Sequence, residues 1–239
     1  MTQSTLFPRG LALLVLLAGM SGASSVQARH SFQAGLGFAS AIPQGAFQDN
    51  TDANGYGIGG SFFWRPPSSP LLLGVDLSYL VYGHQERTEF LNPNIPEVTV
   101  EVTTDNNLVQ GALALRLQPM RGTLRPYVEG LLGFNYLFTE SAIRDEDDNE
   151  EVASSKNFDD TALAWGGGGG LMIEVYRGDD RPGRVRSVAI DLQGRYLVGG
   201  EARYLKEGSI RREESRLTFD SHRSDTDLVT WRVGAALEF

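Results

Sequence analysis

Apolar and other side chains alternate along the last eleven residues of the sequence almost without a break. Val229, Trp231 and Val233 occupy one set of alternate positions, whereas Thr230 and Arg232 occupy the other. Successive side chains leave opposite faces of a β-strand, so this period of two predicts a strand with one apolar face. The same period recurs in seven further segments: 32–38, 56–64, 71–81, 110–117, 128–138, 163–175 and 188–198. Together they predict an all-β chain.

The connections between these segments alternate in length. Three are short, at 66–70, 118–124 and 177–187, and four are long and polar, at 41–55, 83–106, 139–160 and 199–227. Most apolar faces run about 9–11 residues, the length that a tilted strand needs to cross a bilayer. A soluble β-sandwich, the alternative fold, has no reason to sort its loops this way. The pattern predicts an eight-stranded antiparallel transmembrane up-and-down β-barrel with both termini at the end of the short turns.

Aromatic residues near the ends of the segments fit this orientation. Three fall at the ends that lead to the short turns, namely Trp64, Tyr127 and Phe239, and three fall toward the long loops, namely Tyr82, Phe138 and Trp165. Amphipathic rings favour the interface between lipid and water. We therefore expect two aromatic girdles around the barrel.

The N-terminal segment has the features of a secretory signal. Arg9 precedes an apolar run over 11–18, and Val26-Gln27-Ala28 forms a small-x-Ala cleavage site. The run is too short to span a bilayer as a helix, which needs about 20 residues. The sequence thus predicts a signal peptide over 1–28 and a β-barrel domain over 29–239.

Composition excludes several classes of function. The formal net charge is −9, and no basic face is visible, which argues against nucleic acid as a partner. The sequence contains no cysteine, so it predicts no disulfide framework and no lipid-anchoring thiol. No pattern points to a cofactor.

Two motifs resemble those of small eight-stranded outer-membrane barrels of the OmpA/OmpX type. The segment 125–134, RPYVEGLLGF, is similar to that family's Arg-Pro-Tyr-Val strand, and 42–47, IPQGAF, is similar to its Pro-x-Gly-x-Phe segment. The resemblance implies a monomer in the bacterial outer membrane with periplasmic termini, surrounded by lipids and lipopolysaccharide. It also implies that the barrel-assembly machinery reads the last strand, with Trp231, Leu237 and Phe239 as the assembly signal. OmpA continues into a peptidoglycan-binding domain, whereas this chain stops at the barrel, so tethering to the cell wall is not implied.

The faces predicted to point inward carry an unusual set of charges. These residues are Asp76, Arg116, Glu129, Glu174, Asp191, Arg195, Arg232 and Glu238. An eight-stranded barrel has room only for its own side chains, and buried charges must pair. Depth along the strands places Asp76, Glu129, Asp191, Arg195 and Arg232 in one layer, with Asp191 or Glu129 as the expected partner of Arg232. A structural salt-bridge network that fills the lumen is favoured over a gated ion path or a catalytic site.

Candidate chemical motifs are weak. His222-Arg223-Ser224 has the spacing of the His-x-Ser pair of small lipid A deacylases, but its only carboxylate in the last strand, Glu238, lies at the other end. The acidic segment 145–151 begins like a calcium-binding EF-hand loop but has Glu150 where that loop needs glycine. The glycine run 166–170 lacks the lysine of a phosphate loop. The sequence therefore predicts no catalytic, cofactor or metal site, and no enzyme.

The sequence leaves three classes of function open. The favoured hypothesis is a structural or surface-interaction role, namely envelope integrity, adhesion or binding of an extracellular ligand by the loops. A narrow channel for small solutes is the alternative, and a lipid A-modifying enzyme is the third. Alternating residues in the second and fourth long loops, such as Val98, Val100 and Val102, predict strands that continue past the membrane as a raised hairpin edge.

Overall fold

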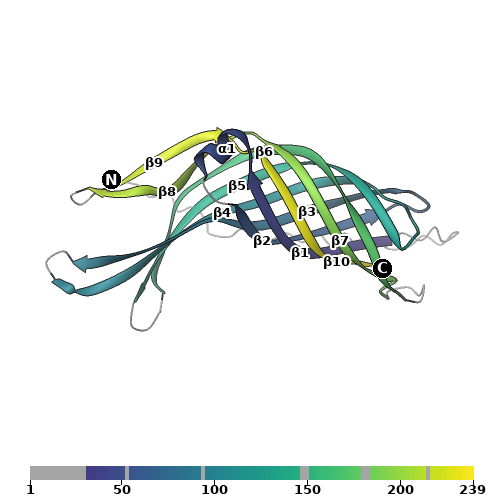
Figure 1. The fold of residues 1–239 in the computed structure, drawn as a ribbon, viewed down its shortest axis with the longest axis horizontal. Helices are drawn as coiled ribbons and strands as arrows, with labels where there is room; N and C mark the ends of the chain where they lie inside the picture. The colour runs from purple at the N-terminus through teal and green to yellow at the C-terminus, as the bar shows by residue number, and fades with distance from the viewer. Residues whose placement is uncertain (1–30, 52–53, 93–94, 146–150, 179–183, 214–215) are drawn as a thin grey trace, which may run out of the picture.

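The computed structural model describes residues 31–51, 54–92, 95–145, 151–178, 184–213 and 216–239, and the predicted signal peptide lies outside them. Eight strands close into an antiparallel barrel in the order β1-β10-β7-β6-β5-β4-β3-β2 (Figure 1). The strands are β1 Ser31–Pro43, β2 Gly55–Arg65, β3 Leu71–Asn92, β4 Ile95–Leu117, β5 Leu124–Asp145, β6 Glu151–Arg177, β7 Ser187–Gly199 and β10 Leu228–Glu238. The predicted fold class and the three short connections are thereby confirmed.

The first and last strands of the barrel pair along their whole length. Gln33 lies opposite Glu238, and Pro43 lies opposite Leu228. Beyond the last ladder pair, the Phe239 amide donates to the carbonyl of Phe32 at 3.0 Å, and the Phe32 amide donates back at 2.9 Å. The two rings lie 6.4 Å apart. Phe239 therefore completes the seam that closes the barrel.

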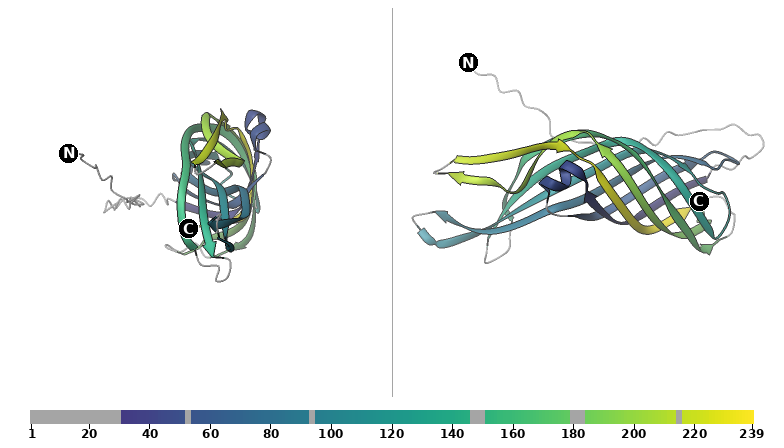
Figure 2. Two further views of the ribbon diagram at one scale, coloured as in Figure 1. Left: turned by 90° about the vertical axis from the view of Figure 1, so that its left-hand side faces the viewer. Right: turned by 45° about the horizontal axis from the view of Figure 1, so that its top comes forward.

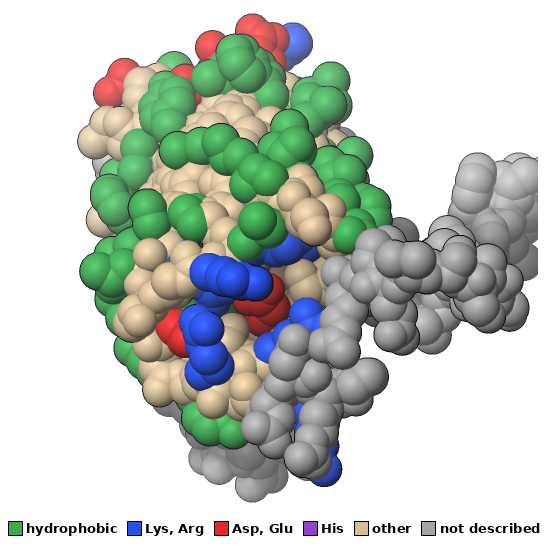
Figure 3. Space-filling model, turned by 90° about the vertical axis from the view of Figure 1, so that its right-hand side faces the viewer, with side chains coloured by type: hydrophobic (Ala, Val, Ile, Leu, Met, Phe, Trp, Pro, Cys, Tyr) green, Lys and Arg blue, Asp and Glu red, His purple; other side chains and the backbone are tan. Residues whose placement is uncertain are grey.

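The outer surface of the barrel is apolar and the inner face is largely polar. Outward side chains such as Phe38 and Leu163 are 79% and 76% exposed, whereas Arg116 and Glu129 on the inner face are buried. Hydrophobic side chains cover much of the wall in Figure 3. This pattern is the reverse of a soluble barrel, and it suits a wall that faces hydrocarbon. The described residues include no helix that is long and apolar enough to cross a membrane.

Two of the predicted girdle aromatics point inward instead. Tyr127 and Tyr82 are each 4% exposed, because each lies one position out of phase with the lipid-facing residues of its strand. Trp165 does face outward, as do Tyr56 and Tyr176.

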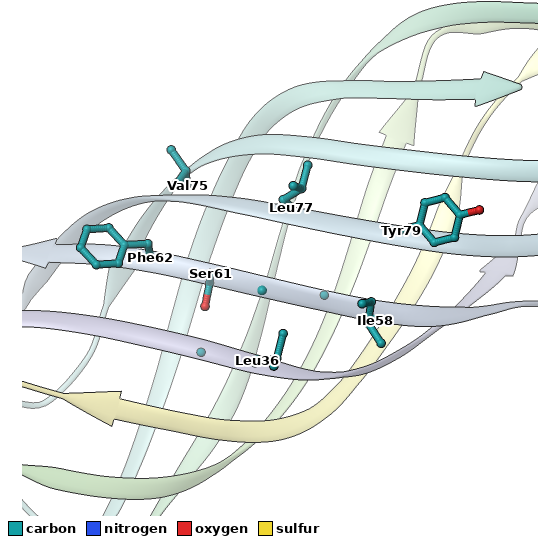
Figure 4. Close-up of a pocket in the computed structure, with 10 residues that line it drawn as sticks. Leu36, Ile58, Ser61, Phe62, Val75, Leu77 and Tyr79 are labelled. Carbon is teal, nitrogen blue, oxygen red and sulfur yellow. The ribbon is translucent and has the colours of Figure 1, made fainter. Parts of the chain in front are cut away.

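Shallow grooves mark the outer wall where glycines replace larger side chains. One groove of about 460 Å³ runs over β1, β2 and β3, with Leu36, Ile58, Phe62, Val75, Leu77 and Tyr79 around Gly35, Gly59 and Gly60 (Figure 4). Its lining is almost wholly apolar.

Four strands continue beyond the barrel at the end opposite the short turns. Pairing of β2 with β3 stops at Tyr56 and Val81, and pairing of β7 with β6 stops at Gly199 and Ala164. The β3–β4 ladder runs on to Asn92 and Ile95, and β5–β6 runs on to Arg144 and Glu151. These extensions form what we call the raised sheet, residues 83–92, 95–106, 139–145 and 151–160 (Figures 1 and 2).

The raised sheet confirms the continued strands predicted for the second long loop and corrects the prediction for the third. Segment 139–160 was expected to be a loop, but its described part is strand that pairs with itself and with β4. The residues of this segment are mostly polar and show no apolar alternation, so no signal of period two marks a strand there. The fourth loop also forms a hairpin, β8 Glu201–Glu213 with β9 Arg216–Asp225.

An apolar cap closes the barrel at the end opposite the short turns, where the β8–β9 hairpin lies and which we call the hairpin end. The short helix α1, Gly45–Asn50, follows β1, and Gly45 adopts φ +56°, a conformation that glycine permits. Phe47 of α1 is buried between Tyr82 and Tyr204, with ring centroids at 5.9 and 5.0 Å. Around it lie Ala39, Ala41, Leu80, Leu108, Leu137, Ala162, Ala202 and Leu228, which together with these three residues we call the outer cap.

A carboxylate holds the β8–β9 hairpin against β6. The Asp160 carboxylate accepts hydrogen bonds from the backbone amides of Arg203 at 2.8 Å and Thr161 at 2.9 Å. The amide of Arg203, followed by that of Thr161, lowers the pKa of Asp160 by favouring its charged form. This contact keeps β8, and with it Tyr204, over the mouth of the barrel.

The glycine run of β6 makes space for large side chains inside the barrel. A Cβ added at Gly168 would lie 2.8 Å from Cγ of Arg195, and one added at Gly170 would overlap the ring of Tyr127. By contrast, a Cβ at Gly130, on the outer face of β5, would meet no atom within 4 Å. The run is therefore a packing feature.

We predict that Gly170→Ala destabilises the barrel by about 1–3 kcal/mol, because the new methyl group forces Tyr127 out of its position. Gly130→Ala is the matched control and should change the free energy of unfolding by less than about 0.5 kcal/mol. Urea unfolding in lipid vesicles measures both values. Equal losses in the two variants would contradict this account of the glycine run.

Candidate functional site

The centre of the lumen holds a network of arginines and carboxylates. Arg195 of β7 donates through Nη1 and Nη2 to the two carboxylate oxygens of Asp76 of β3, at 2.7 and 2.8 Å. Nη1 of Arg232, from β10, lies 2.8 Å from Oδ2 of the same carboxylate. All three side chains are almost fully buried. Two arginines therefore share Asp76.

Glu129 of β5 connects this pair to a third arginine. Its Oε1 accepts from Nε of Arg195 at 2.6 Å, and its Oε2 accepts from Nε of Arg116 at 3.0 Å. Arg116 of β4 lies directly opposite Glu129 in the β4–β5 ladder. We call these five residues, Asp76, Arg116, Glu129, Arg195 and Arg232, the central network.

Aromatic rings enclose the guanidinium of Arg116. Its Cζ lies 4.1 Å from the centroid of Phe63 and 4.0 Å from that of Tyr127. Stacking of a cation between two ring faces is favourable in a dry site. The sequence analysis did not place either ring in the lumen. Phe63 lies two positions from Arg65 and Tyr127 two positions from Glu129, so each ring points to the same inner face as that charged residue.

The structure brings together five of the eight predicted lumen charges, and Asp191, Glu174 and Glu238 lie outside that cluster. Asp191 has no arginine in the described contacts, and its carboxylate accepts from the Tyr127 hydroxyl at 2.7 Å. Glu174 lies toward the short turns, where Arg177 donates to it at 2.7 and 3.0 Å. The expected partners of Arg232, Asp191 or Glu129, were wrong, because Asp76 takes that position. Depth along one strand says nothing of which strands face each other across the lumen.

Neutral polar side chains form a layer between the central network and the outer cap. The Gln110 amide donates to Asn135 at 3.0 Å, and Asn135 in turn donates to the Thr226 carbonyl at 3.3 Å. The lumen is thus filled by a charged layer, a neutral polar layer and an apolar layer in succession.

A second charged cluster lies at the end of the barrel that carries the short connections, which we call the turn end. The Arg125 guanidinium donates to Glu238 at 2.6 Å, and Arg65 lies 4.0 Å from the same carboxylate. Both arginines are buried. The sequence analysis placed Glu238 inside the barrel but not Arg65 and Arg125, although both occupy inward-facing positions on their strands, β2 and β5.

The candidate catalytic serine has its hydroxyl in packing contacts. Ser224 Oγ lies 2.8 Å from the Tyr204 hydroxyl and donates to the carbonyl of Asp225 at 3.0 Å. Arg223 forms an ion pair with Glu201 at 2.6 Å. The side chain of His222 lies outside the described residues. Ser224 therefore supports Tyr204 in the outer cap.

Metal-ligating clusters were sought in the described residues as well. None of the groups of His, Asp and Glu within the described ranges brings three ligands together. The acidic segment 145–151 falls almost entirely outside those ranges.

The three residues of the expected assembly signal lie on the last strand or just after it. Trp231 and Leu237 face outward from β10, and the ring of Trp231 covers Gly194 of β7. Phe239 contacts Phe32 across the seam. Their reading by an assembly machinery stays a prediction.

We predict that Arg232 is coupled to Asp76 and not to Glu129. Arg232→Ala should destabilise the barrel by about 2–3 kcal/mol. This loss is small for a broken buried ion pair, because Asp76 still has Arg195 as a partner. In double-mutant cycles, Arg232→Ala with Asp76→Ala should show an interaction energy of about 1 kcal/mol or more, and Arg232→Ala with Glu129→Ala a smaller one. Urea unfolding measures both cycles, and a larger coupling to Glu129 would refute the assigned pairing.

Three solved structures resemble this fold. Neisserial surface protein A is 15% identical, with 87% of this chain and 95% of that chain covered and a TM-score of 0.41. A major outer membrane protein from Thermus thermophilus is 12% identical, with 88% and 100% covered and a TM-score of 0.47. The N-terminal β-barrel domain of Pseudomonas aeruginosa OprF is 12% identical, with 88% and 97% covered and a TM-score of 0.33. Comparison with curated proteins finds no match.

The family comparison covers nearly the whole sequence. The model of the outer membrane protein β-barrel domain matches residues 11–239. The closed barrel of eight strands, with its apolar outer wall, agrees with that match. The chain therefore belongs to the outer membrane protein β-barrel domain family, and it is a β-barrel protein of the bacterial outer membrane.

Proposed function

We propose that this protein is a closed, non-catalytic barrel that displays the raised sheet to partners outside the cell. The observation that carries the proposal is the extension of β3, β4, β5 and β6 beyond the residues at which β2 and β7 stop pairing. An isolated loop needs no such extension. A sheet held above the barrel instead provides a rigid surface on a fixed scaffold.

The edges of the raised sheet are suited to strand addition. In the described residues, β3 beyond Val81 pairs only with β4. Gly200 and Arg203 contact β6 at Leu163 and Asp160, and β6 before Asp160 pairs only with β5. The backbone groups on the outer side of each edge are therefore left for a partner strand or for water. An extended peptide that adds to a sheet edge gains main-chain hydrogen bonds irrespective of its sequence, and side-chain contacts then supply specificity.

The orientation and the surroundings form part of the same proposal. The turn end, where β1 begins and β10 ends, faces the periplasm, and the raised sheet faces the exterior. Outer-membrane lipids and lipopolysaccharide cover the apolar wall, and the glycine-lined groove of Figure 4 suits an acyl chain. The barrel is a monomer that the barrel-assembly machinery inserts, with Trp231, Leu237 and Phe239 as the signal.

The lumen supports a scaffold role over the alternative of a narrow channel. Arginines and carboxylates contact each other across its centre, and Phe47 and Tyr204 pack over its mouth. A solute would have to displace both layers. The contacts of Ser224 likewise give no support to the third alternative, a lipid A-modifying enzyme.

We predict that the protein in a planar lipid bilayer shows no single-channel conductance steps above the background of the bilayer, because side chains fill the lumen. Truncation of the outer cap by Phe47→Ala should leave this result unchanged, since the central network still blocks the path. Stable steps from the wild-type protein, absent in a boiled sample, would favour the channel instead.

We predict that shortening the raised sheet abolishes surface binding and leaves the barrel intact. One variant replaces 84–105 by a tight Asn-Gly turn, and a second replaces 140–159 in the same way. Both should retain the shift in gel mobility between unheated and heated samples, because the barrel ladders remain complete. Proteoliposomes that carry the wild-type protein should retain peptides from a library of extended peptides that the shortened variants lose.

The matched control for this experiment replaces the β8–β9 segment 205–221 by a turn, which leaves the raised sheet in place. Its binding to the peptide library should equal that of the wild type. Loss of binding in this control alone, with full binding by the other two variants, would transfer the proposed function to the β8–β9 hairpin.

A further inference from the structure

The turn end of the lumen contains a buried arginine whose donors are only partly used. Arg65, the last residue of β2, is 6% exposed. Its Nη1 donates to the carbonyls of Ser69 and Gln118 at 3.4 and 3.3 Å. Its Nε and Nη2 have no hydrogen-bond partner among the described residues. A buried unsatisfied donor on a charged group is costly, so its retention calls for a ligand.

The unused donors form one edge of the guanidinium. Nε–H and the adjacent Nη2–H run parallel, and this is the geometry with which arginine binds a carboxylate or a phosphate through two oxygens. The one carboxylate nearby does not use it, because Oε1 of Glu238 lies 4.0 Å from Nε, beyond hydrogen-bond range. The Nε of Arg125 is unsatisfied as well.

The arginines at this end of the lumen outnumber the carboxylates with which they form ion pairs. Among the described residues, Arg65, Arg125 and Arg177 form ion pairs only with Glu174 and Glu238, whereas the buried carboxylate of Asp191 accepts from the Tyr127 hydroxyl. Glu174 is fully occupied by Arg177, which leaves Arg65 and Arg125 to share Glu238. Figure 3 views the molecule from the turn end and shows basic and acidic side chains gathered inside the ring of strand ends.

Neutral donors complete the surroundings. Gln33 and Gln118 are buried, and the amide group of each contacts the thioether of Met172 at 3.2 Å, a weak acceptor. The Oε1 atom of each is unsatisfied in the described residues. Rotation of either amide by half a turn would aim its two N–H donors at a new acceptor.

We propose that Arg65 and Arg125, assisted by Gln118, form a binding site for an oxyanion group, a phosphate or a carboxylate, at the turn end of the barrel. The anion accepts hydrogen bonds from the unused donors of Arg65 along one edge of the guanidinium. Glu238 limits the affinity, because it places a like charge beside the site. This proposal rests on the turn end alone and is independent of the raised sheet.

The test uses the full barrel, refolded in octyl glucoside, a detergent without a phosphate group, and labelled with ¹⁵N-arginine. Inorganic phosphate is the probe, and the Nε–H resonance of Arg65, assigned through its absence in Arg65→Lys, is the readout. We expect a saturable shift of this resonance. A shift that stays linear in phosphate, equal to that of an exposed arginine, would overturn the proposal.

Three variants separate a site from a general charge effect. Line broadening of the added phosphate in phosphorus NMR measures binding, and it should be lost in Arg65→Gln. In Arg65→Lys, which keeps the charge but not the paired N–H donors of the guanidinium, Kd should rise about tenfold. Glu238→Gln should tighten binding by about tenfold, because it removes the like charge. Arg177→Gln is the control, since Arg177 is engaged with Glu174, and its Kd should equal the wild-type value.

Folding of every variant is checked by the shift in gel mobility on heating, and Arg65→Lys keeps the test decisive if Arg65→Gln fails to fold. Unchanged binding in both Arg65 variants would overturn the proposal. Lipid nanodiscs with and without phosphatidylglycerol then distinguish the source of the phosphate. A shift of the Arg65 resonance that needs only the anionic lipid assigns the site to a lipid headgroup, whereas a shift that needs added phosphate assigns it to a soluble anion.

Discussion

The pairing of buried arginines with carboxylates is the constraint on which the rest of this structure depends. Asp76 and Glu129 hold three arginines, and the five side chains come from β3, β4, β5, β7 and β10. A charge left unpaired in a lumen surrounded by hydrocarbon would be severely destabilising. The network therefore favours one register of these five strands, since a slip of one residue would turn each charge toward lipid.

Complementarity of volume makes this network possible in so narrow a barrel. Gly168 and Gly170 of β6 give up their side chains where Arg195 and Tyr127 need room, and Gly59 of β2 lies beside Arg232. Large residues on some strands are thus matched by glycine on others. Gly59 also lines the shallow groove on the outer wall, together with Gly35 and Gly60.

The two ends of the lumen differ in chemistry. At the hairpin end Phe47, Tyr82 and Tyr204 close the barrel with apolar contacts, and β8 is held in place through Asp160. At the turn end, Arg65 and Arg125 share one carboxylate and keep donors unused. An apolar end excludes ions and a cationic end attracts anions, so any small molecule that enters the lumen would do so from the turn end.

Periodicity alone determined much of this protein. The apolar alternation predicted eight strands, the three short connections and the inward position of Asp76, Glu129, Arg195 and Arg232, because side-chain direction in a strand depends only on parity. The same rule failed for Tyr127 and Tyr82, which were assigned to the girdles by residue type although their parity points inward.

Partners across the lumen were decided by the tertiary structure. Barrel closure and strand tilt decide that Arg232 pairs with Asp76 and that Asp191 accepts from Tyr127 and forms no ion pair with a described arginine. They also bring Arg65 and Arg125 to the same carboxylate, that of Glu238. The strands within 139–160 could not be predicted either, because their sequence shows no apolar alternation. Sequence thus determined which face each residue takes, because that is local geometry, whereas only the closed barrel decided which residues meet, because contacts across a lumen join strands distant in the chain.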